Sequence, residues 1–197
     1  MRLWRLGGVV FPLWSGEGAR LKGGRWNQKG MPAIYTATSF AMGVLEIIAH
    51  ANIGRVPRGT GFIAIDVPEG APIDRVRPED IPGWDAHPPS TSMNFGTAWL
   101  KRCEGLVLLV PSAVTGGLDQ NAVVNPLHPA FAHVSVSPEQ PVQLDPRLFP
   151  TRPFSTGLFP IGAVSHRGLR PRDGAGMMGE WNQPIASIIR PASTVRT

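Results

Sequence analysis

The sequence predicts an α+β fold, in which a compact, mixed and largely antiparallel sheet is flanked by a few helices. Short apolar or alternating segments recur along the chain between Gly- and Pro-rich turns, a pattern typical of β-strands. Few segments have the spacing of helices. The 197 residues, of which 42% are hydrophobic, are enough for one domain with a substantial core. The alternation of short strands with few helices favours α+β.

The expected strands are short and are bounded by Gly or Pro. The segment 106–110 (LVLLV) is a continuous apolar run between Gly105 and Pro111, so we expect it to be buried on both faces. The segment 61–67 (GFIAIDV) alternates between apolar and other residues instead. The expected strands are 2–10, 33–37, 61–67, 106–110, 131–136 and 142–144.

Two helices are expected. The first follows Thr38 or Ser39, either of which can cap its N-terminus, and should end near residues 52–54. Its apolar side chains have the spacing of one helix face. The second and shorter helix covers residues 92–101. The segments expected to be irregular, with at most one short helical turn, are 14–24, 68–90 and 121–129.

The chain divides by composition into a body, residues 1–149, and a tail, residues 150–197. The body holds 13 Lys and Arg against 12 Asp and Glu, whereas the tail holds six Arg and two acids. Gly and Pro recur throughout the tail without apolar periodicity, so we expect it to be loosely packed, disordered or not native to the domain. The basic excess therefore lies in the tail. A nucleic-acid-binding module that uses this tail is an alternative function.

The composition also bears on the compartment and on metals. The single cysteine, Cys103, excludes an internal disulfide and fits a reducing compartment such as the cytoplasm. No apolar run approaches the length of a membrane-spanning helix, and the N-terminus lacks the pattern of a signal peptide. The five histidines form no known metal motif, so we expect no metal site.

The candidate functional residues concentrate in residues 23–50, which read as a Gly-rich turn, a strand and a helix. Arg25 offers a planar fork for phosphate or carboxylate, and Tyr35 offers a ring on which a base or nicotinamide can stack. Glu46 lies roughly 145° from the centre of the helix's apolar face, so main-core packing does not account for it. This set suits a dinucleotide cleaved at its N-glycosidic bond. The alternative is a solvated Arg, a half-buried Tyr and an exposed Glu.

Four further residues are weaker candidates. Gly24 allows a ligand to approach the backbone. Trp26 could line a pocket, although core packing explains it equally well. Ser112, at the end of a strand, could be a nucleophile, a ligand contact or a cap, and it lacks the G-x-S-x-G pattern of hydrolases. Asn125 before Pro126 is most often a turn residue.

The segment GGRWNQKGMPAIYTATSFAMGVLEIIAH resembles the RES-domain family, the toxins of RES–Xre toxin–antitoxin pairs. The similarity continues through LLVPSAV at 108–114 and NAVVNPLHPAF at 121–131 to LDPRLF at 144–149, in the family's order. The residues after which the family is named fall on Arg25, Glu46 and Ser112.

The resemblance implies an ADP-ribosyltransferase-like fold and bacterial growth arrest through consumption of NAD⁺. It implies cleavage of the nicotinamide bond by hydrolysis or phosphorolysis, or transfer of ADP-ribose to a macromolecule. Arg25 and Tyr35, with Gly24 and Trp26, would bind the dinucleotide, Glu46 would serve the ribose and Ser112 would line the pocket; Asn125 is a weaker contact. The implied partners are NAD⁺ as substrate without further cofactor, inorganic phosphate as one acceptor, and an Xre-type antitoxin. Nucleic acid would be reached only through the antitoxin, and a homo-oligomer within the complex stays open.

Overall fold

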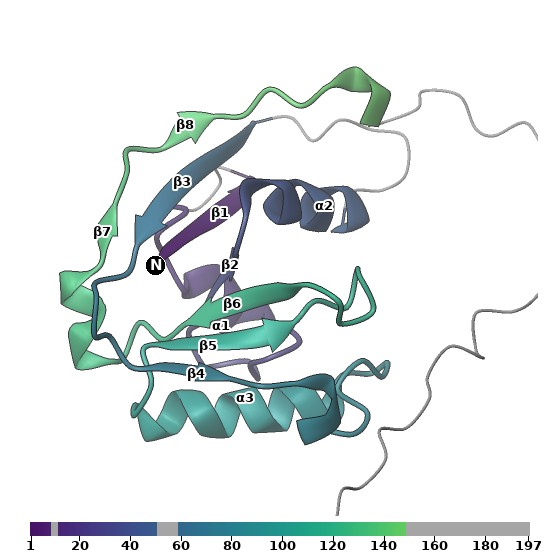
Figure 1. Cartoon of the computed structure of the whole chain (residues 1–197), viewed down its shortest axis with the longest axis vertical. Coiled ribbons are helices and arrows are strands. Elements are labelled where there is room, and N and C mark those ends of the chain that lie inside the picture. Colours follow the sequence, from purple (N-terminus) through teal and green to yellow (C-terminus); the bar gives the residue numbers. More distant parts are fainter. Residues whose placement is uncertain (9–11, 51–58, 149–197) are drawn as a thin grey trace, which may run out of the picture. The chain divides into compact units, whose positions relative to one another are not determined.

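The computed structural model describes residues 1–8, 12–50 and 59–148, and within them the strands form one mixed sheet (Figure 1). Its strand order is β4-β5-β6-β2-β1-β3-β7, and β8 also pairs with β3. All pairs are antiparallel except β4 with β5, which confirms the predicted α+β fold. The strands are β1 (Arg2–Gly8), β2 (Ile34–Ala37), β3 (Thr60–Asp66), β4 (Ile73–Arg75), β5 (Val107–Pro111), β6 (Gln120–Val124), β7 (Ser135–Val136) and β8 (Gln140–Pro141).

Different helices lie against different strands of this sheet. In Figure 1, α2 lies beside β1, and α3 runs along β4 and β5. Among the described helices, none has both the length and the apolar character that crossing a membrane requires. The α-helices are α1 (Glu17–Lys22), α2 (Phe40–His50) and α3 (Ser90–Arg102). The 3₁₀ helices are η1 (Pro78–Asp80), η2 (Pro129–His133) and η3 (Pro146–Leu148).

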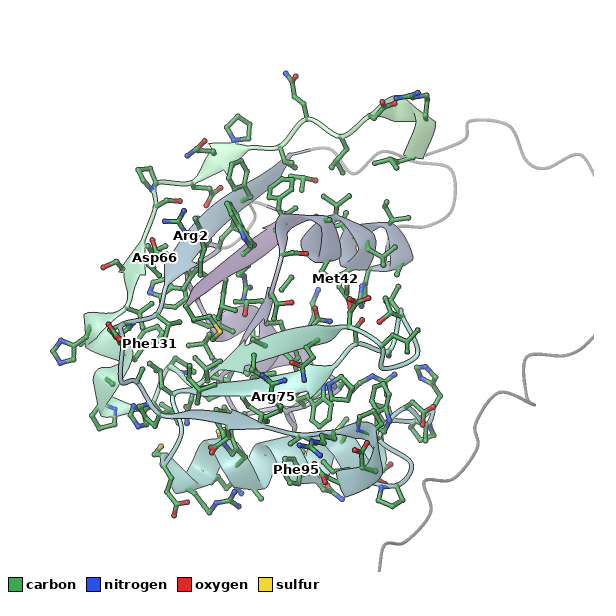
Figure 2. All side chains as sticks on the ribbon, viewed as in Figure 1. Arg2, Met42, Asp66, Arg75, Phe95 and Phe131 are labelled. Carbon is green, nitrogen blue, oxygen red and sulfur yellow. The ribbon has the colours of Figure 1, made fainter. Side chains whose placement is uncertain are left out.

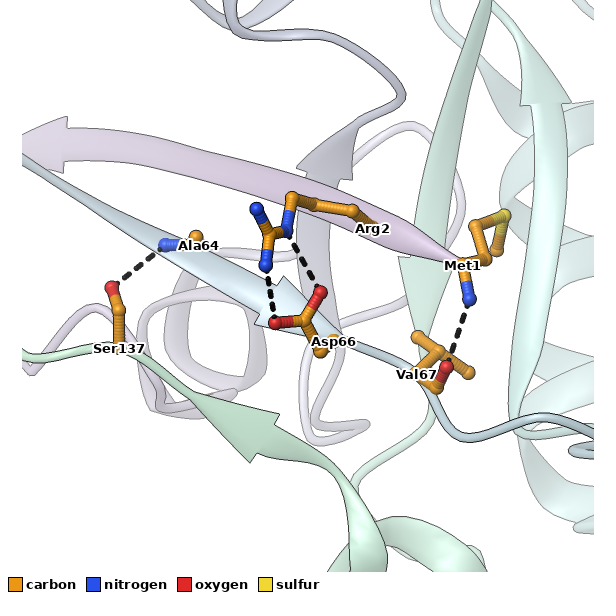
Figure 3. Close-up of polar contacts among 6 residues, drawn as sticks. All are labelled: Met1, Arg2, Ala64, Asp66, Val67 and Ser137. Atoms are coloured by element: carbon orange, nitrogen blue, oxygen red, sulfur yellow. Dashed lines mark hydrogen bonds and ion pairs between the residues drawn. The ribbon is translucent and has the colours of Figure 1, made fainter.

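Strand β1 is paired closely with β3 but only narrowly with β2. The β1–β3 register runs from Arg2 opposite Asp66 to Gly8 opposite Thr60. Figure 3 shows the contacts at one end of this pair, where Arg2 Nε and Nη2 donate to the two carboxylate oxygens of Asp66 at 2.8 Å each. In the described residues, β1 and β2 are in register only where Trp4 lies opposite Ala37. The sheet is therefore weakly joined between β1 and β2.

The core consists of two clusters on the two faces of β5. Val107 and Leu109 belong to the first cluster, while Leu108 and Val110 belong to the second. All residues of β5 are buried, which confirms the prediction for this apolar run. Aromatic side chains extend both clusters: the partly buried Phe131 packs on the first and Phe95 of α3 on the second (Figure 2).

Helix α2 begins as predicted but presents a different face to the protein. Ser39 Oγ accepts a hydrogen bond from the Met42 backbone N–H at 3.1 Å and so caps the helix. The buried residues of α2 are Met42 and Gly43, and Glu46 lies one turn beyond them on the same side. The prediction that Glu46 lies away from the packed face was wrong. The helix is apolar on most sides, so periodicity alone misidentified the buried face.

Several other predicted elements differ from the structure. The segment 14–24 contains α1, which begins two residues after Ser15 and ends before Gly23, whose φ is 74°. The segment 121–129 was predicted to be irregular, but its first residues form β6, which is paired on both sides. The segment 131–136 is mostly the helix η2 rather than a strand, and β8 precedes the strand predicted at 142–144. Strand β4 lies in the segment predicted as irregular.

Three predictions concern residues outside the described ranges. They are the last part of the first predicted strand, the end of the first predicted helix and the tail 150–197.

Candidate functional site

A cavity of about 880 Å³ collects the main predicted site residues. Its lining comes from β1, α1, the turn that follows α1, β2, α2 and the end of β5. Arg25, Tyr35 and Glu46 all line it, together with Gly24 and Trp26. The guanidinium, the phenol ring and the carboxylate thus share one hollow, as the sequence analysis expects.

The turn that carries Arg25 is fixed by short backbone contacts. Gly24 and Asn27 exchange backbone hydrogen bonds across it, at 2.9 and 3.4 Å. Helix α3 supports the same turn, because Thr97 Oγ1 accepts from the Gln28 backbone N–H at 2.9 Å. A side chain at Gly96 of α3 would collide with the backbone that follows Arg25. The position of Arg25 therefore depends on the close approach of α3.

The guanidinium of Arg25 contacts the loop between η1 and α3. Nη1 donates to the carbonyl oxygens of Trp84 at 2.9 Å and of Ala86 at 3.3 Å. Nη2 lies 3.3 Å from Nε2 of His87, which also lines the cavity. Trp84 is only 5% exposed, so its carbonyl is held by the core. Arg25 is thereby held at the cavity wall by a loop about sixty residues away in the sequence.

The hydroxyl of Tyr35 is engaged inside the protein. It donates to Asn27 Oδ1 at 2.7 Å and accepts from the Trp26 backbone N–H at 2.9 Å. Burial raises the pKa of this phenol well above its ordinary value, against the smaller opposing effects of these contacts and of Arg25. A Cβ at Gly24 would lie 2.5 Å from this hydroxyl. Tyr35 therefore fixes the Arg25 turn, and its ring rather than its hydroxyl is available to a ligand.

The carboxylate of Glu46 is oriented by two side chains. Ser112 Oγ donates to Glu46 Oε1 at 3.0 Å, and Asn121 Nδ2 donates to the same oxygen at 2.5 Å. Ser112 lies just after β5 and is fully buried, whereas Asn121 belongs to β6 and lines the cavity. With Oε1 held twice, Oε2 is the oxygen left for a ligand. The expectation that Ser112 lines the pocket was therefore wrong, because it reaches the cavity only through Glu46.

His50 is the other polar residue on the cavity side of α2. Its Nδ1 lies 2.7 Å from the backbone carbonyl oxygen of Glu46 and 3.9 Å from Glu46 Oε2. The side chain is largely exposed, so the imidazole stands at the edge of the cavity.

Two buried polar atoms in the described part of the chain lack a hydrogen-bond partner, and both belong to residues that line the cavity. They are Nη1 of Arg5 and Oδ1 of Asn121. Burial lowers the pKa of Arg5 to about 10, so its guanidinium is still charged at neutral pH. These two atoms have almost no accessible surface, so they mark incomplete hydrogen bonding behind the cavity wall rather than groups exposed in it.

Two residues that were predicted to contact the ligand are buried in the core. Asn125 is fully buried, donates to the Leu100 carbonyl at 2.9 Å and accepts from the Leu127 N–H at 3.0 Å. It does not line the cavity, so the predicted contact with a ligand was wrong, and Asn125 has a structural role. Trp26 is 3% exposed and packs edge-on against Phe95 at 6.4 Å. It contributes to the lining from within the core.

The charges around the cavity are mostly positive. Arg5, Lys22 and Arg25 line it, and Glu46 is the one carboxylate among the described residues of the lining. Across the described residues, no group of three or more His, Cys, Asp or Glu side chains could hold a metal ion. The balance of charge in the lining therefore favours an anion that also carries a locally positive group.

The sequence analysis missed Arg5, His87 and Asn121. Asn121 could have been identified by recognising β6, since the strand brings it beside the end of β5. Arg5 gave a weaker signal, an arginine among apolar residues of an expected strand. His87 lies in a segment without periodicity, so no local pattern marked it.

Comparison with known proteins identifies the family of this chain. The family model of the RES domain matches residues 2–145. An ADP-ribosylating toxin named Prs from Sphingobium sp. is 35% identical over 138 residues, which cover 68% of this chain and 85% of that protein. A toxin Res from Pseudomonas putida is 33% identical over 151 residues, which cover 76% of this chain and 100% of that protein.

A solved structure gives the same result for the fold. A chain of the M. tuberculosis MbcT–MbcA toxin–antitoxin complex matches with a TM-score of 0.59 and 25% identity, over 75% of this chain and 85% of that chain. The family match spans nearly the whole described body, including every residue of the cavity lining. The chain therefore belongs to the RES-domain family of toxins.

Proposed function

We propose that this protein is the toxin of a toxin–antitoxin system and that it consumes NAD⁺ by cleaving the bond between nicotinamide and ribose. The observation that carries the proposal is that Arg25, Tyr35 and Glu46 line one cavity, whose described lining also holds the cations Arg5 and Lys22. NAD⁺ has a doubly charged pyrophosphate, several hydroxyl and amide donors, and a positively charged nicotinamide ring. These groups match the guanidinium groups of Arg5 and Arg25, the ring of Tyr35 and the carboxylate of Glu46.

In the proposed reaction, the protein binds and orients NAD⁺ and stabilises charge. Arg5 and Arg25 bind the phosphates, and the ring of Tyr35 packs against the nicotinamide or the base. The bond between the ribose C1′ and the ring nitrogen breaks, and its electron pair leaves with neutral nicotinamide. Positive charge then develops on the ribose, and the carboxylate of Glu46 stabilises it. The leaving group needs no general acid, and the acceptor attacks C1′ to complete the reaction.

Ser112 and Asn121 serve this step by orienting Glu46. Both donate to Oε1, so the carboxylate is fixed in one rotamer before the substrate binds. Oε2 is then the oxygen that we assign to a ribose hydroxyl and to the developing charge. A carboxylate held in this way does not need to reorganise as charge develops, and this preorganisation contributes to catalysis.

Release of nicotinamide from NAD⁺ tests the proposal. The full chain, made by cell-free synthesis to avoid growth arrest, should release nicotinamide in phosphate buffer, in phosphate-free buffer or in both. The variant Glu46→Gln should lower the rate by a factor on the order of 10² or more while remaining folded. Glu139→Gln is a matched control, because Glu139 is exposed and lies outside the cavity lining. Folded wild-type protein without turnover in either buffer, or full activity in Glu46→Gln, would contradict the proposal.

A second candidate function is transfer of ADP-ribose to a macromolecule. A relative from Sphingobium that is 35% identical to this chain is named an ADP-ribosylating toxin, and this name favours the transfer reaction. The same cavity would serve both reactions, since they share the cleavage step and differ in the acceptor. NAD⁺ labelled in its adenylate half discriminates between them. Label that becomes attached to protein or nucleic acid from a cell extract indicates transfer, whereas free ADP-ribose or its phosphate ester indicates hydrolysis or phosphorolysis.

We further propose that an antitoxin, of the Xre type implied by the family resemblance, binds this protein and covers the cavity. The match to a chain of a solved toxin–antitoxin complex supports an antitoxin partner. Co-expression with the product of the adjacent gene should restore growth and block access of NAD⁺.

A further inference from the structure

We propose that His87 is a positioning residue, which together with two carbonyls of its loop orients the guanidinium of Arg25 to bind one phosphate through two parallel hydrogen bonds. The inference rests on the proposed function in one respect, namely that the anion is a phosphate of the substrate. The orientation of Arg25 by His87 can be measured without any substrate.

Arg25 has more hydrogen-bond donors than its contacts with the loop use. A guanidinium has five N–H groups, and the loop receives three contacts from it. Two come from Nη1, to the carbonyls of Trp84 and Ala86, and one comes from Nη2, to His87 Nε2. With one N–H used in each contact, Nη1 is fully occupied. The N–H of Nε and one N–H of Nη2 remain, and no described residue accepts from Nε.

We assign the His87 contact to the N–H of Nη2 that points away from Nε, so that the two remaining donors lie on the same edge of the guanidinium. This edge of Nε and Nη2 binds two oxygens of one carboxylate or phosphate in parallel. The chain already uses it elsewhere: in Figure 3, Nε and Nη2 of Arg2 donate to the two carboxylate oxygens of Asp66. Arg25 therefore presents the edge that Arg2 uses, but without a partner among the residues that the structure describes.

The loop that holds Arg25 is itself well supported. Trp84 packs in the second core cluster, and its backbone N–H donates to the Ile81 carbonyl at 3.0 Å. The Ala86 N–H donates to the Gly83 carbonyl at 3.2 Å, which fixes the second acceptor. His87 completes the set as an exposed side chain at the cavity. The two carbonyls fix Nη1, and His87 restricts rotation by occupying Nη2.

The contact also defines the form of His87 that does this. Nε2 has to accept from Arg25, so the ring is neutral and its proton is on Nδ1. A glutamine at this position has a side-chain oxygen that can accept in the same way, whereas an alanine cannot. The pair of variants His87→Gln and His87→Ala therefore separates the loss of the acceptor from the loss of histidine.

The first measurement concerns catalysis. His87→Ala should raise KM for NAD⁺ by about 5- to 10-fold, with kcat within about 2-fold of wild type, because the phosphate is bound equally in the ground state and the transition state. His87→Gln should restore most of the affinity. The control is His133→Gln, at an exposed residue of η2 outside the cavity lining. An unchanged KM in His87→Ala, or a fall in kcat without any change in KM, would overturn the proposal.

The second measurement needs no substrate. Nitrogen-detected NMR reports rotation of the Arg25 guanidinium, whose signal is assigned by its absence in Arg25→Lys. Rotation should be faster in His87→Ala than in wild type and slow again in His87→Gln. Equal rotation in wild type and His87→Ala refutes the positioning role whether or not NAD⁺ is cleaved. Faster rotation in a protein that does not act on NAD⁺ would support the role of His87 and contradict only the proposed function.

Discussion

Arg5 gives the sharpest test of the cavity, because its charge is held there without a partner. Burial lowers the pKa of this guanidinium well below its ordinary value, to about 10. One pKa unit corresponds to about 1.4 kcal/mol, so the shift corresponds to about 3 kcal/mol. Other atoms of the half-buried side chain keep some contact with solvent, so we expect a net cost of about 1–3 kcal/mol in the ligand-free protein.

The sign of this effect follows from the direction of the shift. The folded state binds the proton less tightly than the unfolded chain, so the charged form of Arg5 destabilises the protein at every pH below about 10. The cost decreases as the pH rises above about 10, and it disappears once Arg5 is neutral in both the folded and the unfolded state. At neutral pH the full cost applies. A bound anion would remove it by pairing with the guanidinium.

The substitution Arg5→Met should therefore stabilise the ligand-free protein while it weakens ligand binding. We expect a free energy of unfolding about 1–3 kcal/mol higher at pH 7, with Tm rising by about 2–4 °C for each kcal/mol. ADP-ribose, which lacks the scissile bond, should raise Tm of the wild type and raise Tm of the variant much less. Arg2→Met is the matched control on the same strand, since Arg2 is exposed and paired with Asp66.

Thermal and urea unfolding of the three proteins, with and without ADP-ribose, decide the outcome. If Arg5→Met is less stable than the wild type, the guanidinium is satisfied in solution and the electrostatic reasoning is wrong. If the variant responds to ADP-ribose as fully as the wild type, Arg5 does not bind the anion. If ADP-ribose also fails to raise Tm of Arg2→Met, the substitutions affect β1 in general and do not identify a binding site.

Two further substitutions test how the Arg25 turn is held. Tyr35→Phe should leave the Trp26 N–H and Asn27 Oδ1 without their partner and lower the free energy of unfolding by about 1–3 kcal/mol at pH 7. Because the folded-state pKa of Tyr35 is raised, wild-type stability should also decrease above pH 10, and this decrease should be smaller in Tyr35→Phe when urea unfolding is measured against pH. Gly96→Ala should cost about 1–3 kcal/mol in unfolding and raise KM for NAD⁺, since its Cβ would collide with the Trp26 carbonyl. An unchanged KM in Gly96→Ala would show that α3 does not determine the position of the turn.

The sequence predicted the fold class and the core of the site because these depend on dense local patterns. Strand β5 is an uninterrupted apolar run, and Arg25, Tyr35 and Glu46 fall within one short segment whose elements are consecutive. Strand β6 was missed because its polar start and the following turn residues outweighed a short apolar run. Its pairing with β2 and β5, which stabilises it, is not visible locally.

The errors in the site have the same cause. Asn125 was predicted as a weaker contact from the family resemblance, but Asn121, four residues earlier, is the residue that reaches Glu46. Ser112 was expected in the pocket, yet it is buried behind Glu46. Arg5 and His87 come from segments far from residues 23–50, so only the folded chain brings them to the cavity.

Close packing of side chains on two glycines explains how this fold can build such a cavity from a weakly joined sheet. With β1 and β2 registered only at Trp4 and Ala37, hydrogen bonding between these strands contributes little to the position of the site. Instead of hydrogen bonds between the two strands, close packing of side chains against two glycines positions the elements around the site. A Cβ at Gly43 would lie 2.5 Å from Leu6 of β1, so α2 packs on that strand closely enough to bring Glu46 to the cavity. A Cβ at Gly24 would meet the Tyr35 hydroxyl.

The two contacts act on different elements that line the cavity. The contact at Gly43 sets the distance of Glu46 from β1 and hence from Arg5, and the contact at Gly24 sets the position of Arg25 relative to β2. A methyl group at either glycine would displace a wall, not only destabilise the core. For this reason, loss of activity at Gly24 or Gly43 should exceed what the loss of stability explains, whereas a core truncation such as Val107→Ala should reduce stability with little effect on KM. Activity measured at a temperature where all variants are fully folded separates these two effects, and equal behaviour of the glycine and core variants would refute the argument.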